Sequence, residues 1–426
     1  MTNATARRGI DELRGHRSKM FSRSHKIARK LVMRQLEKLQ LGCLRIHEGE
    51  HCFEFGENPD FASTVADIHV HDFAAYRDVA FSGSVGSGEA YMSGYWSSPN
   101  LTNVVRIFVM NLSTLDSMDQ SQSWASKMAL RAFSFLNRNS KEGARKNIGA
   151  HYDLSNEFFS LFLDERMMYS SAIFPNDGYS LSEAATHKLK TVCDKLRLKE
   201  SDHLLEIGTG WGGLAIYAAS EYGCRVTTTT ISKEQYDQAI SAVKKLKLDG
   251  RVKVLLNDYR ELNGSYDKLV SIEMIEAVGH ENYADYFRLC GKLLKPDGLM
   301  LIQAITIADQ RYELAKNSVD FIQRYIFPGG GLPSTHKIME LVARHTPINL
   351  VDFEEIGHHY AKTLKMWRES FWSRIDAVRD LGFDERFIRM WDYYLCYCEG
   401  GFMERTIGTG QYVFAGPEYR VDSPNE

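Results

Sequence analysis

Long apolar runs are absent from this sequence of 426 residues. No stretch of about 18 consecutive apolar residues occurs, so the sequence predicts no membrane-spanning helix. The N-terminal residues lack the apolar core of a secretory signal, and we therefore expect a cytoplasmic protein. The seven cysteines form no CxxC pair and show no zinc-like spacing with histidine. This pattern argues against a metal site and against a disulfide framework.

A strong net charge is also absent, because the formal charge is −3 at pH 7. The sequence therefore gives no reason to expect a nucleic-acid partner. The first 40 residues are an exception, with eleven Lys and Arg against three Asp and Glu. Apolar residues recur among them at near-helical spacing from Met20 onward. Such a basic amphipathic helix either lies on an anionic lipid surface or caps the first domain.

The organisation of the chain changes after its first third. Residues 41 to about 135 mix short strand-like runs with a glycine-punctuated segment, which is typical of a small α+β domain. A polar, basic connector follows at 137–147, and from about residue 181 helices alternate with apolar strands. This alternation predicts a parallel sheet covered on both faces. We therefore expect a small N-terminal domain at 1–140 and an α/β domain at 141–426.

A glycine-rich loop, EIGTGWGG at 206–213, follows the first strand of the α/β pattern. Glycines let the backbone approach a ligand, and the helix that follows offers free N–H groups. An NAD site would need an acidic residue about 20 positions further on, where this chain has threonines at 227–230. Glu206, two residues before Gly208, instead indicates S-adenosylmethionine, whose amino-acid end is cationic.

Further carboxylates follow two later strands. Asp258 and Tyr259 stand where an adenine amino group could donate and a ring could stack, although Asp258 fits a helix N-cap equally well. Glu273 and Glu276 lie in SIEMIEAVGH, at the end of a strand. An unpaired carboxylate is costly to bury, so both need partners or a chemical role. We interpret Glu273 as a structural hydrogen-bond partner.

Several segments together resemble the cyclopropane-fatty-acyl-phospholipid synthases, which are grouped with the mycolic acid methyltransferases. The segments that carry the resemblance are HYDLSNEFFSLFLDERMMYSSAIF (151–174), LLEIGTGWGGLAIYAAS (204–220), TISKEQ (230–235), MIEAVGHENYADYF (274–287) and RYIFPGGGLPS (324–334). The resemblance covers about 150–417 strongly, and GEAYMSGYW at 88–96 extends it weakly toward the N-terminus. It implies a class I S-adenosylmethionine-dependent methyltransferase fold, with a seven-stranded sheet and a helical cover.

The resemblance also implies a reaction. A cis double bond of a phospholipid acyl chain attacks the methyl group of the cofactor, and loss of a proton from that methyl closes a cyclopropane ring. The carbocation formed on the chain needs a dry site lined by aromatic rings. The expected partner is therefore a membrane phospholipid, and the expected location is the inner face of the membrane, as a peripheral protein. A homodimer is compatible with the sequence but is not specified by it.

Site residues follow from the resemblance position by position. The residues that match cofactor-contacting positions are Tyr152, Tyr169, Ser170, Gly208, Gly210, Trp211, Thr230 and Gln235. In the family a bound bicarbonate ion acts as the base. Its expected ligands here are Glu276, the backbone amide of Ile305 and Tyr360, whereas Ser171 and Gln303 replace a cysteine and a histidine.

These two replacements leave two outcomes open. Serine and glutamine still offer hydrogen bonds, so an anion site could persist without a titratable imidazole. Alternatively, ring closure is less favoured, and the cation loses a different proton or accepts a hydride. The product would then be a methyl-branched acyl chain.

Overall fold

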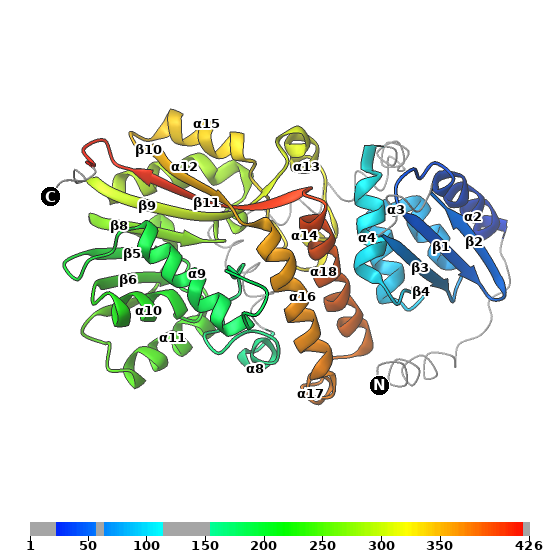
Figure 1. The fold of residues 1–426 in the computed structure, drawn as a ribbon, viewed down its shortest axis with the longest axis horizontal. Coiled ribbons are helices and arrows are strands. Elements are labelled where there is room, and N and C mark those ends of the chain that lie inside the picture. Colours follow the sequence, from blue (N-terminus) through cyan, green and yellow to red (C-terminus); the bar gives the residue numbers. More distant parts are fainter. Residues whose placement is uncertain (1–22, 57–63, 114–153, 421–426) are drawn as a thin grey trace. The chain divides into compact units, whose positions relative to one another are not determined.

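The computed structural model describes residues 23–56, 64–113 and 154–420 (Figure 1). They form two compact units. The first holds the described part of residues 1–133 together with Ser318–Ile326 and Ile375–Glu404, and the second holds the described remainder. The boundary expected near residue 140 and the basic connector lie outside the described residues. Two later segments belong to the first unit, although no local sequence pattern indicates it.

The first unit contains a four-stranded sheet in the order β2-β1-β3-β4. Its strands are β1 (Cys43–Glu48), β2 (His51–Phe55), β3 (Val65–Val70) and β4 (Trp96–Ser97). Strand β1 pairs antiparallel with β2 and parallel with β3. The helices are α2 (Arg23–Leu36), α3 (Ala74–Met92), α4 (Leu101–Met110), α14 (Phe321–Tyr325), α17 (Ile375–Asp380) and α18 (Glu385–Met403). The predicted α+β character of the N-terminal domain is confirmed.

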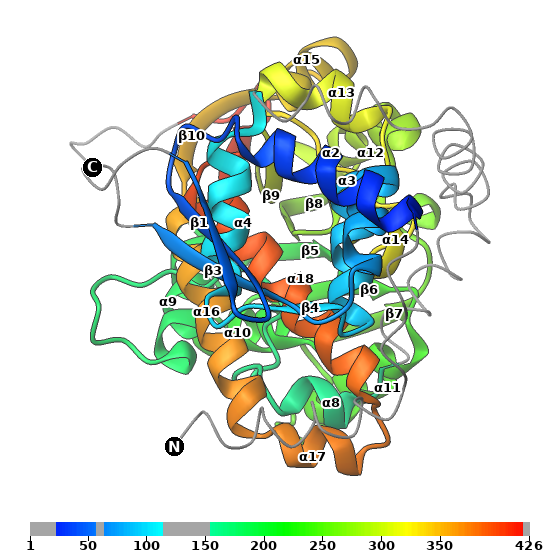
Figure 2. The same cartoon turned by 90° about the vertical axis from the view of Figure 1, so that its right-hand side faces the viewer.

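Helix α18 packs against α3 and α4 within this unit, far from them in the sequence (Figure 2). Buried Asp392 of α18 accepts a hydrogen bond from the Tyr91 hydroxyl at 2.8 Å. Glu399 accepts one from the Thr102 hydroxyl at 2.8 Å. Since unpaired buried carboxylates are costly, these bonds explain how polar groups of α18 are accommodated there.

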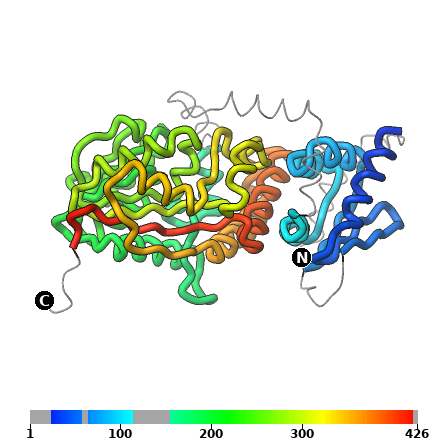
Figure 3. The backbone as a smooth tube through the Cα atoms, turned by 90° about the horizontal axis from the view of Figure 1, so that it is seen from above, coloured from blue at the N-terminus to red at the C-terminus, as the bar shows by residue number. Residues whose placement is uncertain are grey.

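The second unit is built on a seven-stranded sheet in the order β10-β11-β9-β8-β5-β6-β7. Its strands are β5 (His203–Ile207), β6 (Arg225–Thr230), β7 (Val252–Leu256), β8 (Tyr266–Ile272), β9 (Leu294–Ile307), β10 (Asn349–Glu355) and β11 (Ile407–Ala415). Strands β5 to β9 pair in parallel, whereas β11 runs antiparallel to both of its neighbours, β9 and β10. Figure 3 shows β11 as the red tube. The predicted seven-stranded sheet is confirmed.

Helices cover both faces of this sheet. The α-helices of the unit are α8 (Asn156–Ser160), α9 (Leu181–Lys195), α10 (Gly213–Glu221), α11 (Lys233–Lys245), α12 (Tyr283–Leu293), α13 (Tyr312–Lys316), α15 (Thr335–His345) and α16 (Gly357–Ser373). Helices α9, α10 and α11 share one apolar core with the sheet, and α12 and α15 share another. Alternate residues of the central strands, such as Leu204 and Leu205 on β5, belong to the two different cores. The near-continuous apolar strands read from the sequence are therefore explained.

The carboxyl ends of the parallel strands carry the predicted site residues. The loops after β5, β6, β7 and β8 begin with Gly208, Ile231, Asn257 and Glu273, respectively. In an open α/β sheet, ligands bind at this edge. Among the described residues, no helix is long and apolar enough to cross a membrane.

Candidate active site

The glycine loop after β5 has the backbone that its sequence predicts. Gly208, Gly210 and Gly212 have φ angles of +102°, +52° and +92°, in the region that glycine adopts without strain. A Cβ atom placed on Gly210 would meet no other atom within 4 Å. The loop therefore leaves open space beside its backbone, as a closely approached ligand requires.

Glu206 lies buried beneath this loop, with 3% of its surface exposed. Its carboxyl group accepts a hydrogen bond from the Thr228 hydroxyl at 2.6 Å. Burial raises the pKa of Glu206 to about 8, and Thr228 and the buried Lys188 offset only part of that increase. The group is therefore largely neutral at neutral pH until a cation approaches it. A buried carboxyl group of this kind fits the cationic amino-acid end of S-adenosylmethionine.

Thr230 and Gln235 are both buried and bond to each other, with the threonine hydroxyl donating to the amide oxygen at 2.8 Å. Ser232 caps helix α11 by accepting the backbone N–H of Gln235. Trp211 donates its indole N–H to Asn156 at 2.6 Å, and its ring packs on Phe159. This tryptophan therefore anchors the loop to α8.

Asp258 follows β7 as the N-cap of a short 3₁₀ helix, the structural alternative left open by the sequence. Both of its carboxylate oxygens also bond to the Arg260 guanidinium, at 2.8 and 2.6 Å. An adenine amino group would have to share an oxygen with that arginine. The neighbouring Tyr259 ring packs edge-on to Tyr286.

The segment before α9 places Tyr169 and Ser170 in the second unit, whereas Tyr152 lies outside the described residues. The Tyr169 ring contacts the Phe159 and Trp367 rings, with centroids 5.2 and 5.3 Å away. The Ser170 hydroxyl accepts a hydrogen bond from the buried Lys188 ammonium at 2.9 Å. Lys188 was not among the predicted site residues. A lysine at a core position of an amphipathic helix is the signal that could have identified it.

Glu273 occupies the centre of the predicted anion site. Its Oε1 accepts the backbone N–H of Ser171 at 2.9 Å and the Gln303 side-chain amide at 2.7 Å. Its Oε2 accepts the Tyr360 hydroxyl at 2.7 Å. Three of the residues expected to hold bicarbonate thus donate to a carboxylate of the chain itself. The Ser171 hydroxyl takes no part, because it donates to the carbonyl of Ala172.

The backbone at Glu273 is strained. Its φ of +48° lies in the left-handed region, which side chains other than Asn and Asp rarely adopt. Glu273 therefore has a backbone that glycine would adopt more easily. Such strain costs on the order of 1–3 kcal/mol and is concentrated at functional sites. The three hydrogen bonds hold the carboxylate in place, as the structural role predicted from the sequence requires, and the strained backbone makes Glu273 a candidate for a chemical role as well.

Glu276 has a different environment. Its Oε1 accepts the Ile305 backbone N–H at 2.5 Å, whereas both groups were expected to bind an anion, and its buried Oε2 has no hydrogen-bond partner among the described residues. Burial, followed by repulsion from Glu273, raises the pKa of Glu276 to about 8. Burial also raises the pKa of Glu273, but its three donors and Lys188 counteract that effect. At neutral pH we therefore assign the negative charge to Glu273 and a proton to Glu276.

The chain is similar to known proteins over most of its length. The sequence profile of the family described as mycolic acid cyclopropane synthetase matches residues 139–412. The chain is 41% identical over 353 residues to tuberculostearic acid methyltransferase UfaA1 of Mycobacterium tuberculosis, covering 81% of this chain and 82% of that protein. It is 37% identical over 357 residues to the cyclopropane-fatty-acyl-phospholipid synthase of Escherichia coli, covering 83% and 88%.

A solved structure agrees with these matches. The mycolic acid cyclopropane synthase CmaA1, complexed with SAH and CTAB, is 32% identical to this chain and superimposes with a TM-score of 0.60. The alignment covers 64% of this chain and 98% of CmaA1. Sequence and structure comparisons therefore lead to one family.

Proposed function

Since this chain belongs to the mycolic acid cyclopropane synthetase family and is thus an S-adenosylmethionine-dependent methyltransferase that acts on lipids, we propose a specific reaction for it. It methylates the cis double bond of an unsaturated acyl chain in a membrane phospholipid, and the Glu273 carboxylate receives the proton that is lost. The observation that carries this proposal is the convergence of Ser171, Gln303 and Tyr360 on Glu273.

S-adenosylmethionine, when bound, supplies an electrophilic methyl group. The residues that would hold it are Glu206 and the glycine loop, with Thr230 and Gln235 on the ribose side. After the double bond of the substrate has taken up the methyl group, a carbocation remains on the acyl chain. The Tyr169 ring, in contact with Phe159 and Trp367, offers an electron-rich face to such a cation.

The proton acceptor is the Oε2 atom of Glu273. Its Oε1 is held by two N–H groups, which can only donate, and so leaves no room for a proton. The Tyr360 hydroxyl on Oε2 can both donate and accept, so it can reverse its hydrogen bond once Oε2 is protonated. A proton then leaves the delivered methyl carbon, the freed electron pair closes the cyclopropane ring, and Glu273 becomes neutral. No bound bicarbonate is needed in this scheme.

A methyl-branched product is the second candidate. It is favoured by the 41% identity to a methyltransferase named for tuberculostearic acid, a methyl-branched fatty acid. In this case the cation loses a proton from a carbon of the acyl chain itself, which leaves a methyl-branched, unsaturated chain.

A direct assay tests the proposed activity. Incubating the protein with S-adenosylmethionine and vesicles of phospholipid with monounsaturated chains should give a fatty acid heavier by one CH₂. Mass spectrometry of the released fatty acids detects this product. Vesicles with fully saturated chains serve as the control, because they offer no double bond. An equal amount of modified fatty acid from saturated chains, or no modified fatty acid from unsaturated ones, would contradict the proposal.

The first unit is proposed to engage the anionic lipid surface through α2. The buried side of this helix contains Ala28, Val32, Met33 and Leu36. Its other side exposes 63% of Ile27 and 51% of Leu31, which lie one helical turn apart. The basic residues exposed around this apolar pair are Arg23, Lys26, Lys30 and Arg34. Two apolar side chains flanked by cations suit a surface of anionic head groups.

Replacing Lys26 and Lys30 with glutamine should weaken binding to vesicles that contain anionic phospholipid by about 30-fold, since each charge near such a surface contributes about 1 kcal/mol. Vesicle co-sedimentation at low and high salt measures the effect, and the difference from wild type should shrink at high salt. The matched control is Lys244→Gln with Lys245→Gln, two exposed lysines of α11 in the second unit. Equal binding by both double variants would exclude a docking role for α2.

A further inference from the structure

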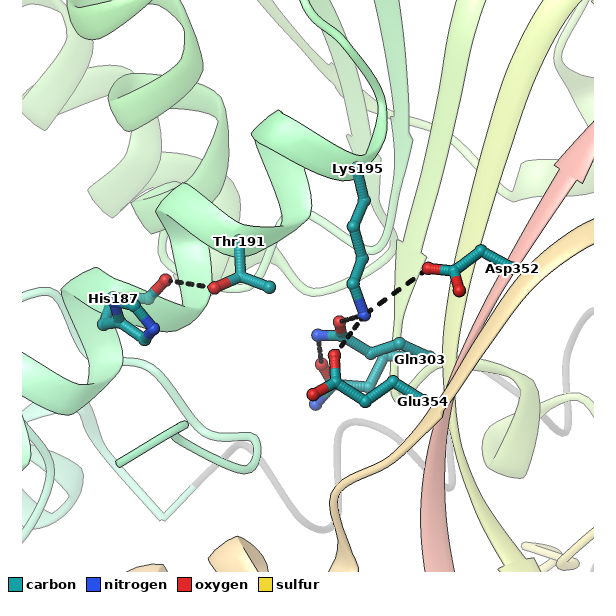
Figure 4. A network of polar contacts seen from close by, with 7 residues as sticks. His187, Thr191, Lys195, Gln303, Asp352 and Glu354 are labelled. Atoms are coloured by element: carbon teal, nitrogen blue, oxygen red, sulfur yellow. Dashed lines mark hydrogen bonds and ion pairs between the residues drawn. The ribbon is translucent and has the colours of Figure 1, made fainter. Parts of the chain in front are cut away.

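A series of hydrogen-bonded polar side chains leads into the active site from Lys195, in the last turn of α9. The Lys195 side chain is 16% exposed and lies beside two acidic residues of β10. Its ammonium group is 2.5 Å from Glu354 and 4.0 Å from Asp352 (Figure 4). It also donates to the side-chain oxygen of Gln411, at 2.8 Å. This lysine therefore joins a surface ion pair to a buried amide.

The series continues through two buried glutamines on neighbouring strands. Gln411 of β11 and Gln303 of β9 are paired residues in the sheet, and neither has exposed surface. The Gln411 amide nitrogen donates to the Gln303 oxygen at 2.9 Å. The Gln303 nitrogen then donates to Glu273 at 2.7 Å. Three consecutive hydrogen bonds thus form a relay from Lys195 to the proposed base.

The groups at the two ends of this relay determine the direction in which its hydrogen bonds run. An ammonium group only donates hydrogen bonds, and an ionised carboxylate only accepts them. Lys195 therefore selects the amide orientation of Gln411 that turns its oxygen toward the ammonium. Gln411 must then present its nitrogen to Gln303, and Gln303 must present its own nitrogen to Glu273. The reverse orientation of either amide would place two oxygens or two N–H groups against each other.

We propose that Lys195 and Gln411 are positioning residues, which hold the Gln303 amide as a permanent donor to Glu273 and so keep this base ionised before the substrate reacts. This inference rests on the proposed function, in which Glu273 takes the proton. Neither residue belongs to the predicted site, and neither needs to contact the substrate. They act only through Gln303.

The expected consequence concerns the pH dependence of turnover. Burial raises the pKa of Glu273, and its hydrogen bonds, including that from Gln303, lower it. The charged and titratable groups that face Glu273 are Glu276 from the same segment, Lys188 from α9 and Tyr360 from α16. With Lys195 removed, the Gln303 amide is free to turn over, so one stabilising donor is lost and the pKa of Glu273 rises. Only the ionised carboxylate can take the proton, so turnover falls as the pH drops below the pKa of Glu273. A higher pKa therefore moves the acid limb of the pH profile to higher pH.

The first test compares Lys195→Met with Lys195→Arg and Lys190→Met. The acid limb of the kcat–pH profile of Lys195→Met should move up by about one pH unit, with about tenfold lower kcat on that limb. Arginine at 195 keeps the donor and should restore most of the wild-type profile. Lys190 is an exposed lysine of the same helix, paired with Asp194, and its replacement should leave the profile unchanged. Cofactor affinity and melting temperature are measured for all three.

A second variant, Gln411→Glu, changes the side chain between Lys195 and Gln303 in the relay. Its carboxylate pairs with Lys195 but has no N–H to offer Gln303, so the shift in the acid limb should equal or exceed that of Lys195→Met. Superimposable profiles for wild type and Lys195→Met, with both proteins folded, would overturn the relay. Failure of the proposed function is distinguishable, because Glu273→Gln would then retain normal turnover. If Glu273→Gln is inactive and Lys195→Met is unshifted, only the relay is wrong.

Discussion

Replacing Glu273 with glutamine is expected to lower kcat by about 1,000-fold, within the range that general acid–base catalysis contributes. Glutamine keeps the size of the side chain, but its neutral amide has no oxygen basic enough to take the proton. The affinity for S-adenosylmethionine should change little, because Glu273 lies among Ser171, Gln303 and Tyr360 rather than in the glycine loop. Turnover on unsaturated vesicles and calorimetric cofactor binding measure the two quantities separately.

The matched comparison is Glu276→Gln. Because burial raises the pKa of Glu276 to about 8, its carboxyl group is largely neutral at pH 7, and glutamine resembles that form. Glu276→Gln should therefore lose much less turnover than Glu273→Gln. The reverse order of the two losses would assign the base to Glu276 and would refute the assignment to Glu273.

A second substitution at position 273 tests whether the site is an anion site at all. Glycine adopts the φ of +48° found at Glu273 without strain, so Glu273→Gly should fold. It leaves three hydrogen-bond donors, from Ser171, Gln303 and Tyr360, without their carboxylate. Added bicarbonate should enter and restore part of the lost turnover, whereas chloride should not. Full inactivity at all bicarbonate concentrations would show that these donors do not form an anion site.

Replacing Gly210 with valine should weaken cofactor binding by at least about 100-fold. Gly210 has a φ of +52°, and a Cβ there projects into open space rather than into the protein. That space is where we propose that the cofactor lies, so the side chain would displace the ligand. A β-branched residue also strains a left-handed backbone. Calorimetric titration with S-adenosylhomocysteine measures the loss.

Gly49→Val is the matched control for strain. Gly49 has a similar φ of +59°, and a Cβ there also meets no atom within 4 Å, but it lies in the turn between β1 and β2 of the first unit. Its replacement should lower the melting temperature by a similar amount and leave cofactor affinity unchanged. Equal affinity losses in both variants would mean that strain, and not occupation of a cofactor site, explains the effect of Gly210→Val.

The sequence predicted the large sheet and its glycine loop because both depend on local patterns. Apolar strands, alternating helices and a Gly-rich turn after the first strand can each be recognised within a short segment of the sequence. The association of α18 with α3 and α4 was not predictable in this way. It depends on pairings such as Tyr91 with Asp392, which are 301 residues apart and have no local signal.

The sequence predicted several residues of the candidate site, but it did not predict that their hydrogen bonds meet at Glu273. Ser171, Gln303, Ile305, Tyr360 and Glu276 were all expected around a bound anion, and the structure brings hydrogen-bond donors of three of them to Glu273. Side-chain alternation along the strand could not reveal this, because Glu273 leaves the extended conformation and takes a left-handed backbone. Gln411 was missed for a related reason. Only strand pairing places it beside Gln303.

The measurement that tests the central claim most directly is the vesicle assay with S-adenosylmethionine whose methyl group is fully deuterated. If Glu273 removes a proton from the delivered methyl carbon, one of the three deuterium atoms is lost, and mass spectrometry should find two in the modified fatty acid. A ring resists mild hydrogenation that would saturate a methylene branch, so treating the product with hydrogen identifies the cyclopropane. Retention of all three deuterium atoms would contradict the claim and would establish a methyl-branched product.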